Sequence, residues 1–284
     1  MTRHDRFLTP RRSLTRLAGA TMALAGLGLV IGSVGTTSAQ DASPAPEVED
    51  AAEVVALPEG FNRKMAREVA AVIDEVHPIR GLPPAEGVNY RVIDDDTFQA
   101  ELEGLFRTEY SDAYVDAEDD AFTRLGLIDA EDELADLVLS LYDSQTLAYY
   151  DPRTATFSLI GPTTKIGSLE SVVVAHEYGH ALQDAAWDLE ARRIKELDRA
   201  DAILAQQALI EGDATAVMYD WAARELNLFD LLQVSASALT RQDSKALRRA
   251  PTILRRQLEF PYIDGFAFVN AIRGRGDWAA VDEV

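Results

Sequence analysis

The chain of 284 residues contains no cysteine, and it has only four histidines. Without thiols, the protein cannot use a cysteine nucleophile, bind zinc through cysteine or form a disulfide. Its stability must therefore come from a hydrophobic core, and the roughly 225 residues that follow the N-terminal region are enough to build one.

Basic residues are scarce: 27 lysines and arginines stand against 48 aspartates and glutamates, and the formal net charge is −21. Removal of residues 1–39, which carry five arginines and one aspartate, would bring the charge near −25. Such a chain repels a phosphate backbone and an anionic lipid surface. The charge therefore excludes nucleic acid as a partner and favours solubility.

Several catalytic motifs are also missing. The chain has no G-x-S-x-G nucleophile elbow, no P-loop and no glycine-rich dinucleotide fingerprint. The acidic run Asp94-Asp95-Asp96 could indicate glycosidase or calcium chemistry, but helix capping and surface charge explain it. No internal repeat is present.

The N-terminal region does contain a long apolar run, Leu17–Val34, which follows five arginines and precedes Thr37-Ser38-Ala39. This order is typical of a secretory signal peptide. Arg11-Arg12 followed by Ser13-Leu14 favours the twin-arginine route, although a Sec signal or an uncleaved membrane anchor fits the same residues. We therefore expect residues 1–39 to be a signal peptide and the protein to be exported: secreted, periplasmic or associated with the cell envelope. Membrane contact is expected only if this segment stays uncleaved.

Residues 40–58 are predicted to be a disordered acidic linker rich in proline and alanine, because they have no apolar face to bury. Residues 59–284 are predicted to form a single domain. In its first half, apolar periodicity predicts a helix over residues 62–76 that Pro78 ends, and a second helix from Asp95 or Asp96 to Tyr110. A surface helix or turn over residues 112–120 and a further helix capped by Asp129 are expected to follow.

Strand signals are confined to the middle of the chain. Residues 88–93 alternate as a short strand, and residues 146–150 and 156–160 flank a turn at Asp151-Pro152-Arg153-Thr154, which predicts a β-hairpin. A helix capped by Ser168 follows. From residue 191 onward only helices are expected, with breaks near Asn227, residues 241–244 and Phe260-Pro261. The predicted fold class is α+β, mainly α.

The segment His176-Glu177-Tyr178-Gly179-His180 fits the pattern H-E-x-x-H. In this pattern two imidazoles one helical turn apart hold a zinc ion, and the glutamate acts on a metal-bound water. The two histidines lie on a helix face that is otherwise apolar and would pack in the core. Two polar side chains on such a face need hydrogen-bond partners or a metal ion. The alternative is a pair of core histidines satisfied by hydrogen bonds.

Catalytic zinc needs a third protein ligand and an open position for water. No histidine follows His180, which excludes the metzincin arrangement and leaves an acidic ligand. Glu211 is the only charge on the helical stripe over residues 204–222, and a carboxylate there needs a metal or, alternatively, an arginine. Asp184 and Asp213 are the rival ligands, but Asp184 is expected instead to orient an imidazole or to cap a helix. Asp213 points away from Glu211 around the helix.

These residues resemble the gluzincin branch of zinc metallopeptidases, with H-E-x-x-H on one helix and Glu211 in Glu-Gly-Asp-Ala on a later one. More narrowly, residues 180–184, residues 208–214 and Phe260-Pro261-Tyr262-x-x-Gly265 resemble a mostly uncharacterised family of exported bacterial gluzincin-like proteins. The likeness runs from about Ile79 to the C-terminus.

The resemblance implies a zincin-like (thermolysin-like) domain with a small β-sheet or hairpin before the zinc helix and helices after it. The hairpin region would line a cleft that takes an extended peptide as an edge strand. Thirty residues separate His180 from Glu211, which is more than in the thermolysin-like members. An extra helix near residues 191–199 is expected to account for them.

The sequence thus predicts a zinc-dependent metallopeptidase that holds one Zn²⁺ through His176, His180 and Glu211 and hydrolyses a peptide or protein substrate. The zinc lowers the pKa of its water, and Glu177, as general base, takes the proton and passes it to the leaving amine. Tyr262 is the candidate for stabilising the oxyanion, with an ordinary buried tyrosine as the alternative. His77 is expected to be a helix-end histidine.

Two other hypotheses stay open. The protein could be an exported, non-catalytic binding or envelope protein of gluzincin fold that zinc stabilises, or a membrane-tethered factor whose metal site is incidental. The intact Glu177 favours the peptidase, because a purely structural site has no use for a base beside a ligand.

Overall fold

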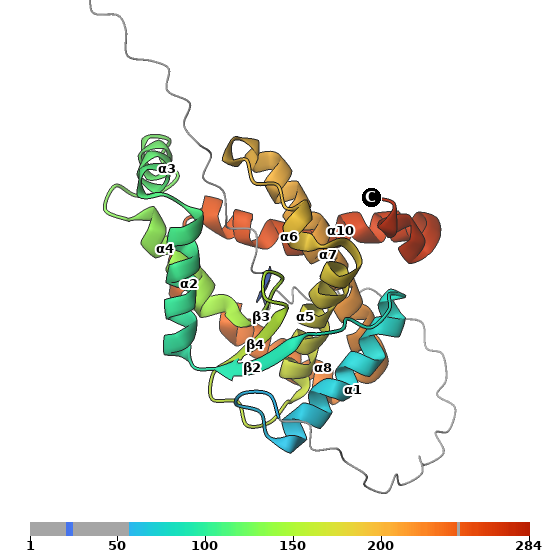
Figure 1. The fold of residues 1–284 in the computed structure, drawn as a ribbon. Coiled ribbons are helices and arrows are strands. Elements are labelled where there is room, and N and C mark those ends of the chain that lie inside the picture. The colour runs from blue at the N-terminus through green and yellow to red at the C-terminus, as the bar shows by residue number, and fades with distance from the viewer. Residues whose placement is uncertain (1–20, 25–56, 243–244) are drawn as a thin grey trace, which may run out of the picture.

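The computed structural model describes residues 21–24, 57–242 and 245–284 of the chain. These residues form a mainly helical α+β fold, as predicted, with a small sheet in its middle (Figure 1). The signal peptide predicted over residues 1–39 and the linker predicted over residues 40–58 lie almost wholly outside the described residues. Only β1 (Thr21–Leu24) and residues 57–58 of those segments are described.

Helices surround the sheet on both sides. Those before the hairpin are α1 (Arg63–Arg80), α2 (Asp95–Glu109), α3 (Asp112–Arg124) and α4 (Leu134–Gln145). Those after it are α5 (Ser168–Trp187), α6 (Leu189–Arg192), the 3₁₀ turn η1 (Leu197–Arg199), α7 (Ala200–Glu225), α8 (Leu228–Gln242), α9 (Lys245–Arg249) and α10 (Thr252–Asp282). In Figure 1, α2, α3 and α4 lie to the left of the sheet, and α1 and α5 lie to the right.

The sheet is mixed, and its centre is the predicted hairpin. β3 (Thr146–Asp151) and β4 (Thr156–Ile160) pair antiparallel, and β2 (Asn89–Ile93) pairs in parallel with β4. On the other side of β3, the four residues of β1 pair antiparallel with it, so the strand order is β1-β3-β4-β2.

The alternation of side chains along the hairpin divides the core into two faces. Tyr150 and Phe157 point to the main core, where they meet the apolar stripes of α1 and α5. Tyr149 points to the opposite face and packs against Phe98 and Leu102 of α2. The hairpin is therefore sandwiched between helices, and α5 lies at the centre of the fold.

Both prolines expected to break helices lie inside helices instead. α1 continues past Pro78 to Arg80 and ends at Gly81, whose φ of 78° closes the helix while its N–H bonds the carbonyl of His77. α10 continues past Pro261, because its contact with α7 outweighs the hydrogen bond that a proline cannot make. The break predicted at Phe260-Pro261 was therefore wrong.

Several helix starts also differ from the predictions by a few residues. Asp94, rather than Asp95 or Asp96, caps α2 by accepting a hydrogen bond from the N–H of Thr97. α4 begins at Leu134, where Asp119 rather than Asp129 accepts the first N–H. α5 begins at Ser168, so its cap is Gly167, whose N–H bonds the carboxylate of Glu170. At α2 and α4 several acidic residues stand close together before the helix, so a local pattern does not decide which of them becomes the cap.

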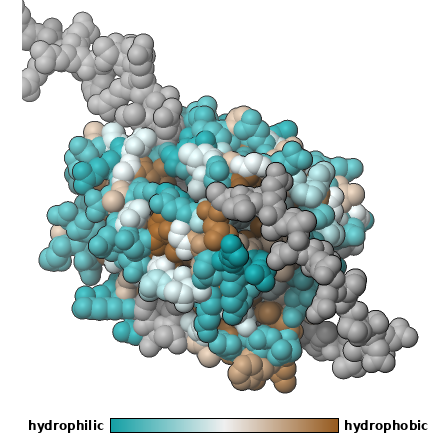
Figure 2. All heavy atoms as spheres, turned by 60° about the horizontal axis from the view of Figure 1, so that its bottom comes forward, coloured by the Kyte–Doolittle hydropathy of each residue, from teal (hydrophilic) through white to brown (hydrophobic). Residues whose placement is uncertain are grey.

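The surface fits the acidic composition. Figure 2 shows one face of the molecule, where hydrophilic residues predominate and hydrophobic residues gather in smaller patches between them. None of the described helices combines the length and the apolar character needed to cross a bilayer.

Candidate metal centre

The helix that carries H-E-x-x-H runs through the middle of the core. Every residue of α5 from Val172 to Gln183 is buried, and His176, Glu177 and His180 are no more than 2% exposed. A polar side chain in such surroundings needs a partner, because burial without a hydrogen bond or a charge is unfavourable.

A close contact between two helices brings that partner to the histidines. A Cβ placed on Gly179 of α5 would lie 3.3 Å from the Cα of Ala214 on α7, which is a tight contact that only a small shift of the neighbour could relieve. On the other side of α7, a Cβ on Gly212 would lie 2.3 Å from backbone atoms of Gly265 on α10. The small residues let the three helices approach closely, and Glu211 between them faces α5.

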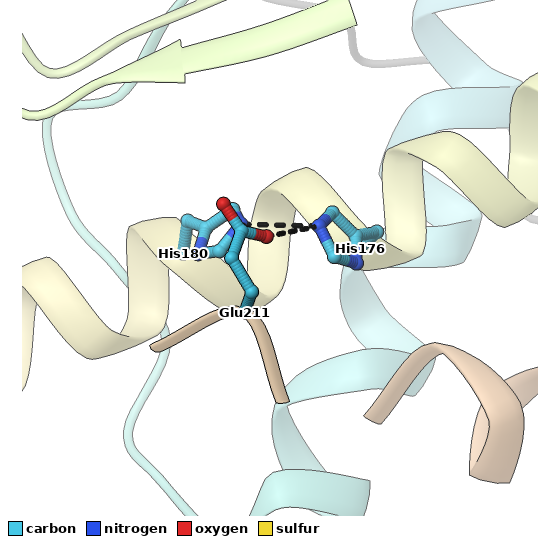
Figure 3. Close-up of side chains that lie close together, drawn as sticks. All are labelled: His176, His180 and Glu211. Carbon is cyan, nitrogen blue, oxygen red and sulfur yellow. Dashed lines mark hydrogen bonds and ion pairs between the residues drawn. The ribbon is translucent and has the colours of Figure 1, made fainter. Parts of the chain in front are cut away.

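Three side chains converge as a result (Figure 3). The Nε2 atoms of His176 and His180 are 3.1 Å apart, and the nearer carboxylate oxygen of Glu211 lies 3.1 Å from the first and 3.3 Å from the second. Each residue offers one ligand atom, and the three atoms lie within 4.8 Å of one another. Among the described residues, this is the group that could hold a metal ion.

The spacing can be compared with what a metal requires. Nitrogen and oxygen ligands at about 2.0–2.1 Å from a tetrahedral ion stand about 3.3 Å apart. The three separations observed here, 3.1 to 3.3 Å, agree with that value. The residues therefore fit a single cation held by two imidazoles and a carboxylate.

Gln183 bonds the ring nitrogen of His180 that faces away from the candidate metal position. Its side-chain oxygen lies 2.9 Å from Nδ1 of His180, and its amide nitrogen donates to the carbonyl of Ile210, the residue before Glu211. Because the amide nitrogen faces a carbonyl, the amide oxygen must face the ring, so Nδ1 of His180 donates. Nε2 is then the nitrogen that faces the shared centre.

The charges of the three groups are coupled in the metal-free protein. Burial alone would lower the pKa of His180, but the carboxylates of Glu211 and Glu177 overcome it and raise this pKa to about 9. Burial lowers the pKa of His176. Burial alone would raise the pKa of Glu211, yet the two imidazoles hold it at about 2. Without a metal, His180 is therefore protonated and pairs with the Glu211 carboxylate, and the proton on its ring supplies the positive charge that a metal cation would bring.

Glu177 is fully buried beside this group. Its Oε2 accepts a hydrogen bond of 2.7 Å from the backbone N–H of Tyr150 on β3, and its charge acts on His180. The hydroxyl of Tyr150 donates to Asp184 at 2.9 Å, two turns further along α5. β3 is therefore tied to α5 at two points, one of them at Glu177.

The two rival acidic residues are engaged elsewhere. Asp184 accepts from the N–H of Leu189, the first residue of α6, and from the hydroxyl of Tyr150, so it takes the capping role of the two expected for it. Asp213 pairs with the guanidinium of Arg80, whose Nε and Nη2 both donate to it at 2.9 Å. His77 lies in the last turn of α1, where a helix-end histidine was expected.

Two tyrosines lie beside the group. The ring of Tyr262 on α10 has its centroid 5.9 Å from that of His176, and its side chain is buried. Tyr142, at the end of α4, was not singled out by the sequence. Burial, and to a lesser degree the negative charge of Glu211, raise the pKa of its hydroxyl.

The roles of Gln183 and Tyr142 could have been found only in part from the sequence. Gln183 stands three residues after His180 on the same helical face, so it was placed on the stripe but not beside the imidazole. Nothing in the sequence links Tyr142 to Glu211, because the effect of the Glu211 charge on Tyr142 depends on how α4 packs.

The segment that separates His180 from Glu211 also differs from the prediction. The expected extra helix over residues 191–199 is absent from the structure, which has instead the single turn α6 and the 3₁₀ turn η1. The distance in sequence is taken up by these turns and by the first eleven residues of α7.

Comparison of the chain with models of known protein families, with curated protein sequences and with solved structures returned no match.

Proposed function

We propose that this protein is an exported zinc metallopeptidase of the gluzincin kind, which hydrolyses peptide bonds. One observation carries the proposal: the carboxylate of Glu211, from a helix distant in sequence, lies 3.1 and 3.3 Å from the Nε2 atoms of the two H-E-x-x-H histidines. Two imidazoles and one carboxylate, with a fourth position for water, are a ligand set of catalytic zinc.

The residues of the chain divide the work of hydrolysis. His176, His180 and Glu211 would hold the ion, which would supply the Lewis acidity that polarises a carbonyl and acidifies a water. Glu177 would accept the proton of the attacking water and deliver it to the leaving amine. Tyr262, beside His176, is the proposed donor to the oxyanion. The zincin-like fold is part of this proposal.

A peptide substrate is supported by the strand next to Glu177. β3 lies on one side of β4, and its other side pairs with β1, a segment of only four residues within the predicted signal peptide. That pairing indicates that this edge of β3 accepts an extended backbone in antiparallel orientation. Removal of the signal peptide would leave the edge open to a substrate.

The test compares wild-type protein with Glu177→Gln and Glu211→Ala. Glutamine keeps an oxygen that can accept the N–H of Tyr150, so Glu177→Gln should fold and bind zinc as the wild type does while losing hydrolysis of casein and of a peptide library by at least about a hundredfold. Glu211→Ala should lose zinc, measured by metal analysis after dialysis. Equal hydrolysis by wild type and Glu177→Gln, or wild-type zinc affinity in Glu211→Ala, would contradict the proposal.

A second candidate function is a non-catalytic, zinc-stabilised binding protein of the cell envelope. The observation that favours it is the hydrogen bond between Glu177 and Tyr150, which gives the glutamate a structural task in tying β3 to α5. If that task were its only one, purified zinc-loaded wild type would hydrolyse no peptide, and Glu177→Ala would lower the unfolding temperature while Glu177→Gln would not.

A further inference from the structure

The N-terminal segment Thr21–Leu24 returns to the sheet and forms its outer strand, β1. It pairs antiparallel with β3, where Thr21 stands opposite Tyr150 and Leu24 stands opposite Thr146. β1 also lies close to α5, the helix that carries the H-E-x-x-H motif. Residues 25–56 separate β1 from the rest of the described chain, so this contact joins the predicted signal peptide to the candidate metal centre.

β1 and the proposed general base meet at one residue of β3. The backbone N–H of Tyr150 donates to Oε2 of Glu177 at 2.7 Å, and Tyr150 is also the residue that Thr21 pairs with. A peptide that joined this edge as an antiparallel strand would use the backbone groups of β3 that β1 now pairs with. β1 and such a peptide therefore exclude each other.

The domain that follows has a core of its own. The buried apolar clusters formed by the described side chains lie between Phe61 and Val281, and they hold helices against both faces of the hairpin. A chain that begins at Gln40 keeps all of these residues. The fold of the domain is therefore expected to survive when the segment that contains β1 is removed.

We infer that residues 21–24 are an intramolecular inhibitor: in the uncleaved chain they occupy the strand edge that a substrate backbone needs, and the edge opens when residues 1–39 are removed. The inference rests on the proposed function, and it names a regulation of the same site. A segment tethered to its own site is present there at about millimolar effective concentration, so even a weak strand pairing keeps the edge closed. Once it is cut off, the segment is diluted and the edge becomes free.

The first experiment measures binding rather than cleavage, so that it can fail independently of the proposed function. Uncleaved Glu177→Gln protein is titrated with a fluorescent peptide of residues 19–26, and the anisotropy is followed. Proline has no N–H, and successive N–H groups of a strand point to opposite sides, so Met22→Pro with Ala23→Pro disrupts the pairing of β1. We expect this variant to bind the peptide at least about tenfold more tightly than the parent chain.

Two further chains complete this binding experiment. Ala51→Pro with Ala52→Pro is the matched control, because these prolines lie outside β1 and should leave the binding as weak as in the parent chain. A Glu177→Gln chain that begins at Gln40 should bind the peptide as tightly as the Met22→Pro, Ala23→Pro variant. It also tests the open edge without any substitution in β1.

Equal binding by the parent chain and by the chain that begins at Gln40 would overturn the inference, and so would the absence of binding by every form. Hydrolysis of casein is then compared with Glu177 intact, and we expect the chain that begins at Gln40 to cleave at least about tenfold faster than the uncleaved chain. Equal measurable rates would also overturn the inference. If the peptide binds as expected but no form cleaves casein, the closed edge stands and the peptidase proposal fails.

Discussion

Gln183 shows how one side chain can orient a candidate metal ligand. It accepts from Nδ1 of His180 and donates to the carbonyl of Ile210, so it fixes the ring and ties it to the helix that presents Glu211. Groups behind a metal ligand orient it and set which ring nitrogen is free, and their loss weakens metal binding. Asp184, which the sequence offered for this task, lies one position too far around the helix.

Replacement of Gln183 by leucine should therefore lower zinc affinity by about tenfold to a hundredfold without unfolding the protein. The measurement is competition against a chelator of known affinity. Gln183→Glu serves as the matched control, because it keeps an oxygen that accepts from Nδ1 and should stay nearer to wild type. Wild-type affinity in Gln183→Leu would show that the hydrogen bond does not orient the ligand.

Zinc affinity should also depend on pH in a defined way. The pKa of His176 is lowered by burial, so this ring is neutral at pH 7, whereas the pKa of His180 is raised to about 9 by Glu211 and Glu177. Binding a cation must then displace one proton, and the affinity should rise about tenfold for each pH unit between 7 and 9 and level off above.

The same proton bears on the stability of the metal-free protein. The folded pKa of His180 lies above its ordinary 6.5, so its contribution is fully present below pH 6.5 and is lost as the pH rises through about 9. Chelator competition at pH 7, 8 and 9 checks the predicted pH dependence of zinc affinity, with His77→Gln, outside the site, as control. An affinity that stays constant over this range would rule out a protonated His180.

At the scale of elements, glycines decide how closely α7 approaches its neighbours. Gly212 meets Gly265 of α10, and Gly179 of α5 meets Ala214 of α7, on either side of Glu211. The Glu-Gly-Asp-Ala stretch thus combines a candidate metal ligand, a contact with α10, the partner of Arg80 and a contact with α5. Each of its four residues has a separate physical task.

Gly212→Ala should be clearly destabilising, because its Cβ would fall 2.3 Å from backbone atoms of Gly265 and the two helices would have to separate. We expect a loss of at least about 2 kcal/mol in the free energy of unfolding, measured in urea, together with weaker zinc binding. Gly274→Ala is the matched control. It lies in α10 with nothing within 4 Å, and alanine should stabilise it by up to about 1 kcal/mol. Equal stability of both variants would contradict the close helix contact.

At the scale of the whole molecule, Arg80 joins distant parts of the chain. It ends α1, pairs with Asp213 of α7 and with Asp282 near the end of α10, and lies 4.4 Å from the ring centre of Trp278. Its side chain is 1% exposed. Burial raises the pKa of Asp213 despite the neighbouring guanidinium, which marks the pair as one with a large desolvation penalty.

Breaking this pair should therefore be worse than replacing it. Asp213→Ala leaves the buried guanidinium with only the partly exposed Asp282 as a carboxylate partner among the described residues, and it should lower the free energy of unfolding of the metal-free protein by up to about 3–5 kcal/mol. The double variant Arg80→Met with Asp213→Leu should recover a large part of that loss. Glu103→Ala, which breaks the exposed pair with Arg107, is the control and should change little. A double variant less stable than Asp213→Ala would show that the ion pair itself stabilises the fold.

Local sequence patterns predicted the helices and strands of this protein well, but they predicted where the helices begin and end less well. Met65, Val69, Val72 and Val76 recur at helical spacing, so the core face of α1 could be read directly, but its extension past Pro78 could not. Whether a helix continues through a proline depends on what it packs against, and packing partners are not visible in a local pattern. The same reason explains α10 at Pro261.

The sequence by itself determined the hairpin, the mainly helical α+β class and the two histidines with Glu177 on one helix, because these depend on residues within a few positions of each other. It also offered Glu211 as the only charge on an apolar stripe. Only the tertiary structure decided that Glu211 meets both imidazoles, that Gln183 rather than Asp184 supports His180, and that Tyr262 lies beside His176. These depend on how α5, α7 and α10 approach one another. The contacts of Gly179 with Ala214 and of Gly212 with Gly265 allow that approach between segments far apart in the chain.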